Sequence, residues 1–105
     1  MTDAPIAIVW EFIVPAANRA RFEVTYGPEG DWARLFRHAA DFRGTELLRD
    51  GERDGVYLTI DRWASAEAFD RFKRHFGADY LRLDGALEGL ASRETRLGLF
   101  EEAAI

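Results

Sequence analysis

The chain has 105 residues, of which 48% are hydrophobic and 31% are charged, so it is long enough for one folded domain with its own core. It contains no cysteine, which excludes disulfides, thiolate nucleophiles and zinc sites built on cysteine. A net charge of -5, with no basic cluster to offset it, argues against a nucleic-acid partner and against an anionic membrane surface.

Hydrophobic periodicity predicts four strands and several helices. Residues Ile6 to Val14 are apolar on both faces, as expected of a central strand, and Pro15 ends this strand. Asp31 is predicted to cap a second helix, which Phe42-Arg43-Gly44 closes. In chain order, the expected elements are strand 6–14, helix 16–26, a helix from 31, strand 45–50, strand 56–63, a helix capped by Ser65, a break at Gly77, a helix capped by Asp79 and strand 94–100.

The strand at residues 56–63 has two different faces. Val56, Leu58 and Ile60 form an ordinary apolar face. The other face combines two aromatic rings, a hydroxyl and a carboxylate, a mixture typical of a polar-lined cavity: Tyr57, Thr59, Asp61 and Trp63.

The order strand, helix, strand, strand, helix, strand is the split βαβ arrangement. We therefore expect an α+β ferredoxin-like domain with a four-stranded antiparallel sheet, in which the first and third strands are central and the helices lie on one face. The opposite face, on which we place Tyr57 and Trp63, needs a cover because it is apolar. A second copy is the simplest cover, so we predict a homodimer that packs sheet against sheet.

Five segments resemble the antibiotic-biosynthesis-monooxygenase-like family of the dimeric α/β-barrel superfamily. The resemblance covers nearly the whole chain and implies a single domain of this family over residues 1–105. It also implies a homodimer whose two sheets form a joint α/β barrel, with a pocket between each sheet and its helices. The segments are IVWEFIV at 8–14, YGPEGDWARLF at 26–36, GTELLRD at 44–50, YLTIDRW at 57–63 and ETRLGLF at 94–100.

The resemblance implies one of two chemistries. Quinone-forming members oxidise polycyclic phenols with O2 and no metal, using pocket Trp, Asn, Tyr and Arg side chains. Haem-degrading members use a strand asparagine, a tryptophan at the end of the third strand and a histidine ligand on the following helix. Trp63 matches the tryptophan, and His75 lies on the following helix, but no strand carries an asparagine, and Asn18 lies in the first helix.

The leading prediction is a monooxygenase-like protein that oxidises a small, flat aromatic ligand with O2 and needs neither cofactor nor metal. The alternative is a non-catalytic small-molecule-binding or structural protein of the same fold. Haem binding or degradation is disfavoured because the strand asparagine is missing. The candidate pocket residues are Trp63 to stack a planar ring, Tyr57, Asp61 as a general base with a raised pKa, and His75.

Each candidate also has a structural alternative. Trp63 suits a core position at a strand end, Asp61 suits a hydrogen bond or an ion pair, and His75 and His38 suit a half-exposed helix flank. Glu11 and Arg96 are expected to form an ion pair between neighbouring strands. The short acidic N-terminus and the lack of a long apolar run predict a cytoplasmic protein without a membrane segment.

Overall fold

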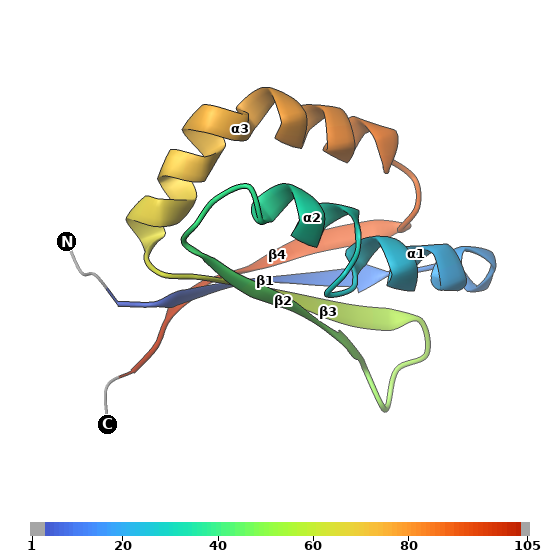
Figure 1. Cartoon of the computed structure of the whole chain (residues 1–105). Coiled ribbons are helices and arrows are strands. Elements are labelled where there is room, and N and C mark those ends of the chain that lie inside the picture. Colours follow the sequence, from blue (N-terminus) through green and yellow to red (C-terminus); the bar gives the residue numbers. More distant parts are fainter. Residues whose placement is uncertain (1–3, 104–105) are drawn as a thin grey trace.

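The computed structural model describes residues 4–103, which form one antiparallel sheet with helices packed on one of its faces (Figure 1). The strand order is β2-β3-β1-β4, so the predicted ferredoxin-like arrangement with the first and third strands in the centre is confirmed. Within this range, no helix is both long enough and apolar enough to cross a membrane. The elements are β1 (Ile6–Ile13), η1 (Ala16–Asn18), α1 (Arg19–Tyr26), α2 (Asp31–Phe36), β2 (Phe42–Arg49), β3 (Val56–Trp63), α3 (Ala66–Ala86) and β4 (Arg93–Glu101).

The second helix is shorter than predicted, and the strand after it begins earlier. Helix α2 ends at Phe36, and residues 42–44, which were expected to close the helix, begin β2 instead. Phe42 pairs with Trp63 across the sheet, and a bulge separates Phe42 from Gly44. Asp31 is the first residue of α2 rather than its cap, because Gly30 takes the N-cap position.

The predicted N-cap of α3 at Ser65 is confirmed, whereas the break predicted at Gly77 is a kink within one continuous helix. The Ser65 hydroxyl accepts a hydrogen bond from the Ala68 N–H at 3.1 Å, which satisfies a free donor of the first turn. The backbone leaves helical geometry at Phe76, where φ is -117° and ψ is 20°, but α3 continues and includes Asp79. In Figure 1 the bent α3 arches over α2 and the sheet.

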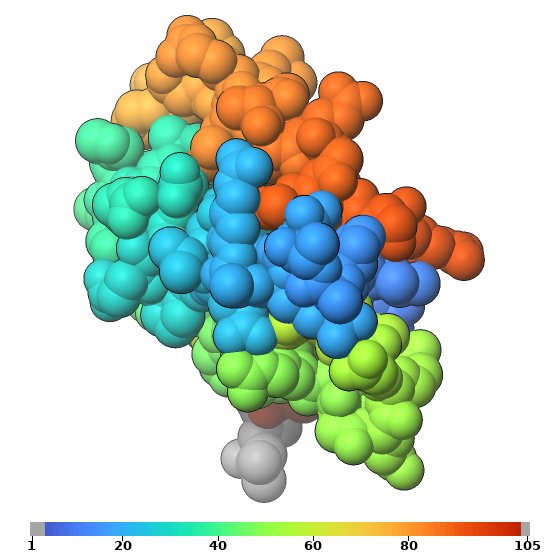
Figure 2. Space-filling view, turned by 90° about the vertical axis from the view of Figure 1, so that its right-hand side faces the viewer, coloured from blue at the N-terminus to red at the C-terminus, as the bar shows by residue number. Residues whose placement is uncertain are grey.

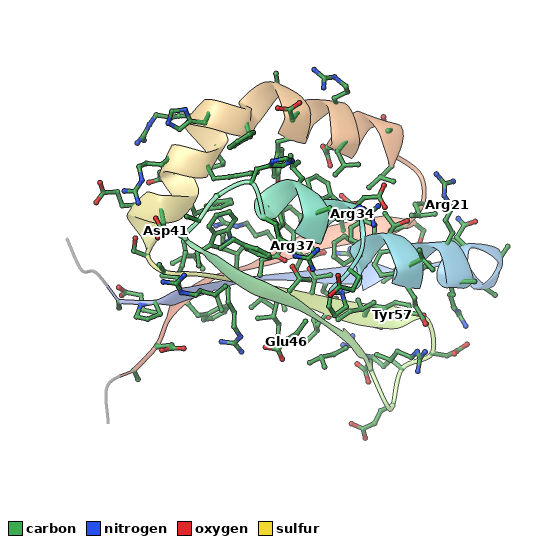
Figure 3. All side chains as sticks on the ribbon, in the orientation of Figure 1. Arg21, Arg34, Arg37, Asp41, Glu46 and Tyr57 are labelled. Carbon is green, nitrogen blue, oxygen red and sulfur yellow. The ribbon has the colours of Figure 1, made fainter. Side chains whose placement is uncertain are left out.

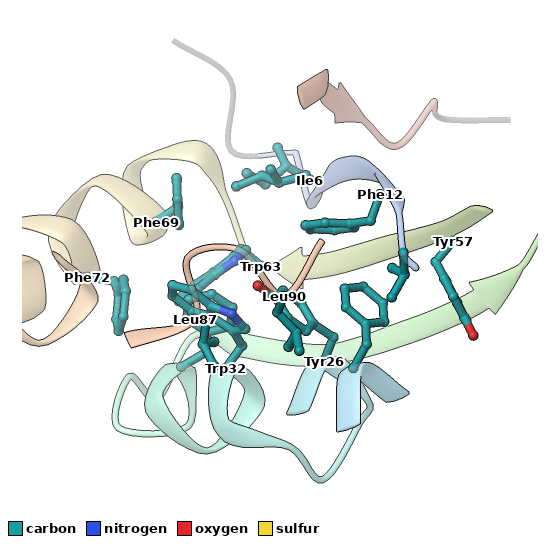
Figure 4. Close-up of a cluster of buried hydrophobic side chains, with 14 residues drawn as sticks. Ile6, Phe12, Tyr26, Trp32, Tyr57, Trp63, Phe69, Phe72, Leu87 and Leu90 are labelled. Atoms are coloured by element: carbon teal, nitrogen blue, oxygen red, sulfur yellow. The ribbon is translucent and has the colours of Figure 1, made fainter. Parts of the chain in front are cut away.

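The placement of Tyr57 and Trp63 on the uncovered face is wrong, because both side chains point toward the helices. Both are buried, with exposed fractions of 3% and 0%. Tyr57 packs on Phe22 of α1 at 4.9 Å between ring centroids, and Trp63 packs on Phe72 of α3 at 5.2 Å. They belong to the aromatic core between the sheet and the helices (Figure 4).

The predicted ion pair between Glu11 and Arg96 is absent from the sheet. Glu11 is opposite Thr95, whereas Arg96 is opposite Trp10, so a bulge in β4 leaves Glu11 and Arg96 on opposite faces. Glu11 instead pairs with Arg53 at 3.1 Å. Glu46, which projects below the sheet in Figure 3, pairs with Arg62 at 2.7 Å on the uncovered face.

Candidate functional site

A pocket of about 150 Å³ lies between the sheet and all three α-helices. Each strand contributes to its floor, and each helix contributes an aromatic wall. Aromatic side chains predominate, and the polar lining groups are hydroxyls and carboxylates. The lining residues are Trp10, Phe12, Tyr26, Trp32, Phe36, Thr45, Thr59, Asp61, Tyr80, Asp84 and Glu94.

The start of α2 places Trp32 against the pocket. Gly30 caps this helix where its backbone meets the end of α1, and a Cβ at this position would overlap the carbonyl oxygens of Val24 and Thr25. Since only glycine fits there, α1 and α2 pack closely. The centroid of the Trp32 ring lies 6.4 Å from that of Tyr26 of α1 and 5.0 Å from that of Tyr80 of α3. Three helices therefore meet at one aromatic wall.

Asp61 supplies a carboxyl group in the floor of the pocket. Its position in the middle of β3 places it between Ile8 of β1 and Thr45 of β2. Burial raises the pKa of this carboxyl from its ordinary 3.8 to about 6, although the Thr45 hydroxyl, which donates to Oδ1 at 2.7 Å, opposes the rise. A carboxyl with a pKa near neutrality can both accept and release a proton under physiological conditions.

Two tyrosine hydroxyls and one indole N–H complete the polar lining. Burial raises the pKa of Tyr26 to about 12 and also raises the pKa of Tyr80, so both stay protonated and can donate. The Nε1 atom of Trp32 is buried without a well-aligned hydrogen bond in the described residues, and its hydrogen-bonding interaction with the Tyr26 hydroxyl opposes the rise in the pKa of Tyr26. An unsatisfied buried donor is costly, so this N–H favours an acceptor supplied from outside.

Of the four predicted site residues, only Asp61 lines the pocket. Tyr57 and Trp63 are six positions apart, a span of about 20 Å along a strand, so the two rings cannot border one small pocket together. Trp63 packs behind the wall, with its ring 5.5 Å from that of Phe36. Its role is to support the pocket from outside the lining.

Tyr57 takes part in a polar cluster at the edge of the sheet. Its hydroxyl donates to Glu23 at 2.6 Å, and Arg49 holds the same carboxylate through Nε and Nη2 at 2.9 and 2.8 Å. The Arg49 and Tyr57 hydrogen bonds hold the pKa of Glu23 at about 2. These contacts fasten α1 to β2 and β3.

The histidines and the asparagine also lie outside the pocket lining. His75 is exposed on α3, and His38 is exposed and stacks on Phe76 at 5.6 Å. The Asn18 amide donates to the Leu90 carbonyl at 3.0 Å, which ties η1 to the connection between α3 and β4. In residues 4–103, no group of three His, Cys, Asp or Glu side chains is placed to hold a metal ion.

The sequence did not identify several lining residues. Trp10 and Phe12 alternate along β1 on the same side as Asp61, so the period of the strand could have grouped them with the site. Trp32 and Tyr80 follow helical stripes that are equally typical of core residues. Glu94 comes from β4, and no local signal connects it with the other lining residues.

The comparisons place the chain among known proteins. A solved structure of an asparagine-to-alanine variant of SnoaB, a cofactor-independent oxygenase from Streptomyces nogalater, is 28% identical with a TM-score of 0.73, over 99% of this chain and 97% of that one. SnoaB itself is 25% identical with a TM-score of 0.66, over 97% and 96% of the two chains. A protein from Pseudomonas aeruginosa is 16% identical with a TM-score of 0.67 over 99% of each chain, a likeness of fold alone.

A search of curated proteins returned no match. The family model described as antibiotic biosynthesis monooxygenase matches residues 6–79, which include β1 to β3 and the first part of α3. The matched region covers most of the chain and contains Asp61 with much of the pocket wall. The chain therefore belongs to the antibiotic biosynthesis monooxygenase family.

Proposed function

We propose that the protein is a cofactor-independent oxygenase that converts a small hydroxyaryl compound to a quinone with O2. The observation that carries this proposal is the Asp61 carboxyl, which stands in the floor of an aromatic pocket with its pKa raised to about 6. Family membership and the likeness to SnoaB support an oxygenase-like role. The substrate class and the role of Asp61 are our own inferences.

The proposed reaction needs a base and an electron-rich ring. Asp61 accepts the proton of the ring hydroxyl, and the phenolate that forms donates electrons to O2. A carbon–oxygen bond then forms on the ring, and the O–O bond breaks with return of the proton from Asp61. One oxygen atom stays on the ring as the second quinone oxygen, and the other leaves as water with the hydroxyl hydrogen and one ring hydrogen.

The volume of the pocket limits the ligand. A cavity of about 150 Å³ in a protein core is large enough to hold benzene, whereas pockets for drug-sized ligands measure about 300 to 1,000 Å³. The pocket measures about 150 Å³, so it suits a ligand with one ring more than several fused rings. The small volume also disfavours haem, which has several fused rings. In addition, the candidate haem ligand His75 is exposed on α3 and does not line the pocket.

Oxygen uptake with simple phenols tests the proposal. We expect the wild-type protein to consume O2 and form quinone from 4-ethylphenol, 1-naphthol or tyramine, and we expect incorporation of one atom of ¹⁸O from ¹⁸O2. Asp61→Asn should reduce kcat/KM by about 100-fold or more, the usual contribution of a general base. Asp70→Asn, on the exposed side of α3, is the matched control and should keep full activity.

A second variant tests Asp61 through its pKa. The rate should rise with pH through about 6 as Asp61 ionises, and Thr45→Val should move this rise to higher pH because the hydrogen bond from Thr45 lowers the Asp61 pKa. Uptake that is unaffected by Asp61→Asn would refute the role of Asp61. Absence of uptake with every phenol, together with retained binding, would favour the alternative of a non-catalytic small-molecule-binding protein.

We also infer that two copies of the chain pair through the uncovered face of the sheet. This face carries exposed apolar side chains on three strands, including Ile13, Leu48 and Phe100. Apolar patches of this kind are typical of interaction sites, and the helices cover only the other face (Figure 1). A sheet-to-sheet homodimer would bury them.

A further inference from the structure

The pocket lining is acidic and contains no basic side chain. Its charged groups are Asp61 in the floor, Asp84 at the end of α3 and Glu94 at the start of β4. The charge of Arg96 opposes the rise in the pKa of Tyr80, but Arg96 is not a lining residue. An excess of one charge in a cleft with apolar walls attracts ligands of the opposite sign.

Asp84 and Glu94 stand where the pocket meets the surface. Both also line a second, more open hollow of about 470 Å³ at the connection between α3 and β4. Figure 2 views this end of the molecule, where the connection (orange) lies above α1 (blue). Neither carboxylate has an ion-pair partner within 4.0 Å in residues 4–103, and burial, together with the charge of Asp84, raises the pKa of Glu94. Arg93 is the one basic residue that lines this hollow, against the acidic Asp84, Glu88 and Glu94, so the entrance keeps an excess of negative charge that favours a cation.

The walls suit the same kind of ligand. Six of the lining residues are aromatic, and the face of an aromatic ring attracts a cation within about 6 Å of its centre. Trp32 adds an independent observation, since it is nine-tenths buried and its indole nitrogen, which interacts only with the Tyr26 hydroxyl, has no well-aligned hydrogen bond in the described residues. This N–H needs an acceptor, which an ammonium group alone does not provide but a ring oxygen does.

We infer that the ligand of this pocket is a hydroxyaryl amine, a single aromatic ring that carries an oxygen and a basic nitrogen. The ring stacks among Trp10, Trp32 and Tyr80, and its oxygen meets the polar groups of the floor. The protonated nitrogen lies at the entrance, between Asp84 and Glu94. This inference rests on the proposed function for the identity of the site, and it adds the charge of the substrate.

Three probes with the same phenol ring and different charges test the inference. They are tyramine, which carries an ammonium group, neutral 4-ethylphenol, and the anion 3-(4-hydroxyphenyl)propionate. We expect calorimetry or ligand-observed NMR without O2 to give tyramine an affinity about fivefold higher than that of 4-ethylphenol, from cation–π and charge contacts of about 1 kcal/mol. The propionate should bind more weakly than either, and added salt should reduce the preference.

Charge-removing variants locate the nitrogen. Asp84→Asn and Glu94→Gln together should bring the ratio of tyramine to 4-ethylphenol affinity to about one. Glu88→Gln is the matched control, because Glu88 lines the open hollow but not the pocket, and it should leave the ratio unchanged. Equal affinities in the wild-type protein, tightest binding of the propionate, no binding of any probe at millimolar concentration, or an equal effect of Glu88→Gln would each overturn the inference.

These results separate the inference from the proposed function. Selective binding of tyramine without O2 uptake would support a hydroxyaryl amine as the ligand and would refute the oxygenase proposal. Equal kcat/KM values for O2 uptake with tyramine and with 4-ethylphenol support the oxygenase proposal and remove the preference for an amine.

Discussion

Asp61→Asn is predicted to stabilise the protein at neutral pH while it removes activity. A carboxyl whose pKa rises on folding binds its proton more tightly in the folded state, so its ionisation costs folding free energy as pH rises through the interval between the two values. The values are 3.8 and about 6 for Asp61, and each pKa unit corresponds to about 1.36 kcal/mol. Ionised Asp61 therefore destabilises the fold by about 3 kcal/mol above pH 7. An amide, which is never charged, avoids this cost and can accept the Thr45 hydrogen bond in the same way.

Urea denaturation at two pH values measures the effect. At pH 7.5 the variant should exceed the wild type in unfolding free energy by about 2 to 3 kcal/mol, and at pH 4.5 the difference should fall to about 1 kcal/mol. Contributions from groups such as Glu23, which change stability at lower pH, cancel in the difference because both proteins contain them. Asp70→Asn on the exposed face of α3 should stay within about 0.5 kcal/mol of the wild type at both pH values. A difference that does not change with pH, or a variant less stable than the wild type at pH 7.5, would refute the assigned pKa.

Three further measurements test the packing and the ligand assignment. Phe72→Ala should lower the unfolding free energy by about 3 to 5 kcal/mol because Phe72 is buried among four aromatic neighbours, whereas exposed Arg74→Ala should change it by less than about 0.5 kcal/mol. Tyr57→Phe should cost about 1 kcal/mol at pH 7, and this cost should shrink as acid protonates Glu23, whose folded pKa of about 2 lies below its ordinary 4.5. A haemin titration followed by the Soret band should show weak binding at most, unaffected by His75→Ala, and a tight complex lost in that variant would restore the haem hypothesis.

The sequence predicted the fold well because its strands have a clear period. Residues 56–63 alternate so regularly that the bounds of β3 were predicted correctly, and Ser65 marked the start of α3. Alternation groups side chains on a face but does not say which face the helices cover. Because both faces of β3 carry large apolar side chains, the pattern did not fix the layer of Tyr57 and Trp63, and they were assigned to the wrong one. The prediction for residues 42–44 was wrong because glycine commonly ends a helix. Here Gly44 instead takes part in a bulge of β2.

The pocket was only partly predictable because its lining comes from seven helices and strands that meet by packing. Asp61 was found because a carboxylate on the same strand face as the rings of Tyr57 and Trp63 is conspicuous. The aromatic side chains of α2 and α3 looked like ordinary core, and the difference between a filled core and a pocket is a matter of a few ångströms. Glu94 follows a long connection, so its approach to Asp84 depends on the whole path of the chain.

The uncovered sheet face gives the last prediction, which concerns the assembly of the protein. Ile13, Leu48 and Phe100 are 37%, 46% and 52% exposed, and the register places them on the side away from the helices. A stable pairing through this face should bury more than about 1,000 Å² in total, so we expect a dimer in light scattering at micromolar concentration. Leu48→Arg places a charge on the apolar part of the joined faces and should yield monomers, because a buried unpaired charge is strongly unfavourable.

Val24 and Leu81 provide the matched controls for this test. They are 74% and 71% exposed, but they lie on α1 and α3, and therefore on the helical side of the molecule. Val24→Arg and Leu81→Arg add the same charge and should leave the dimer intact. A monomeric wild type would refute the pairing itself. A dimer that survives Leu48→Arg but dissociates in Leu81→Arg would show that the copies meet through their helices. In that case the apolar sheet face would need a different partner.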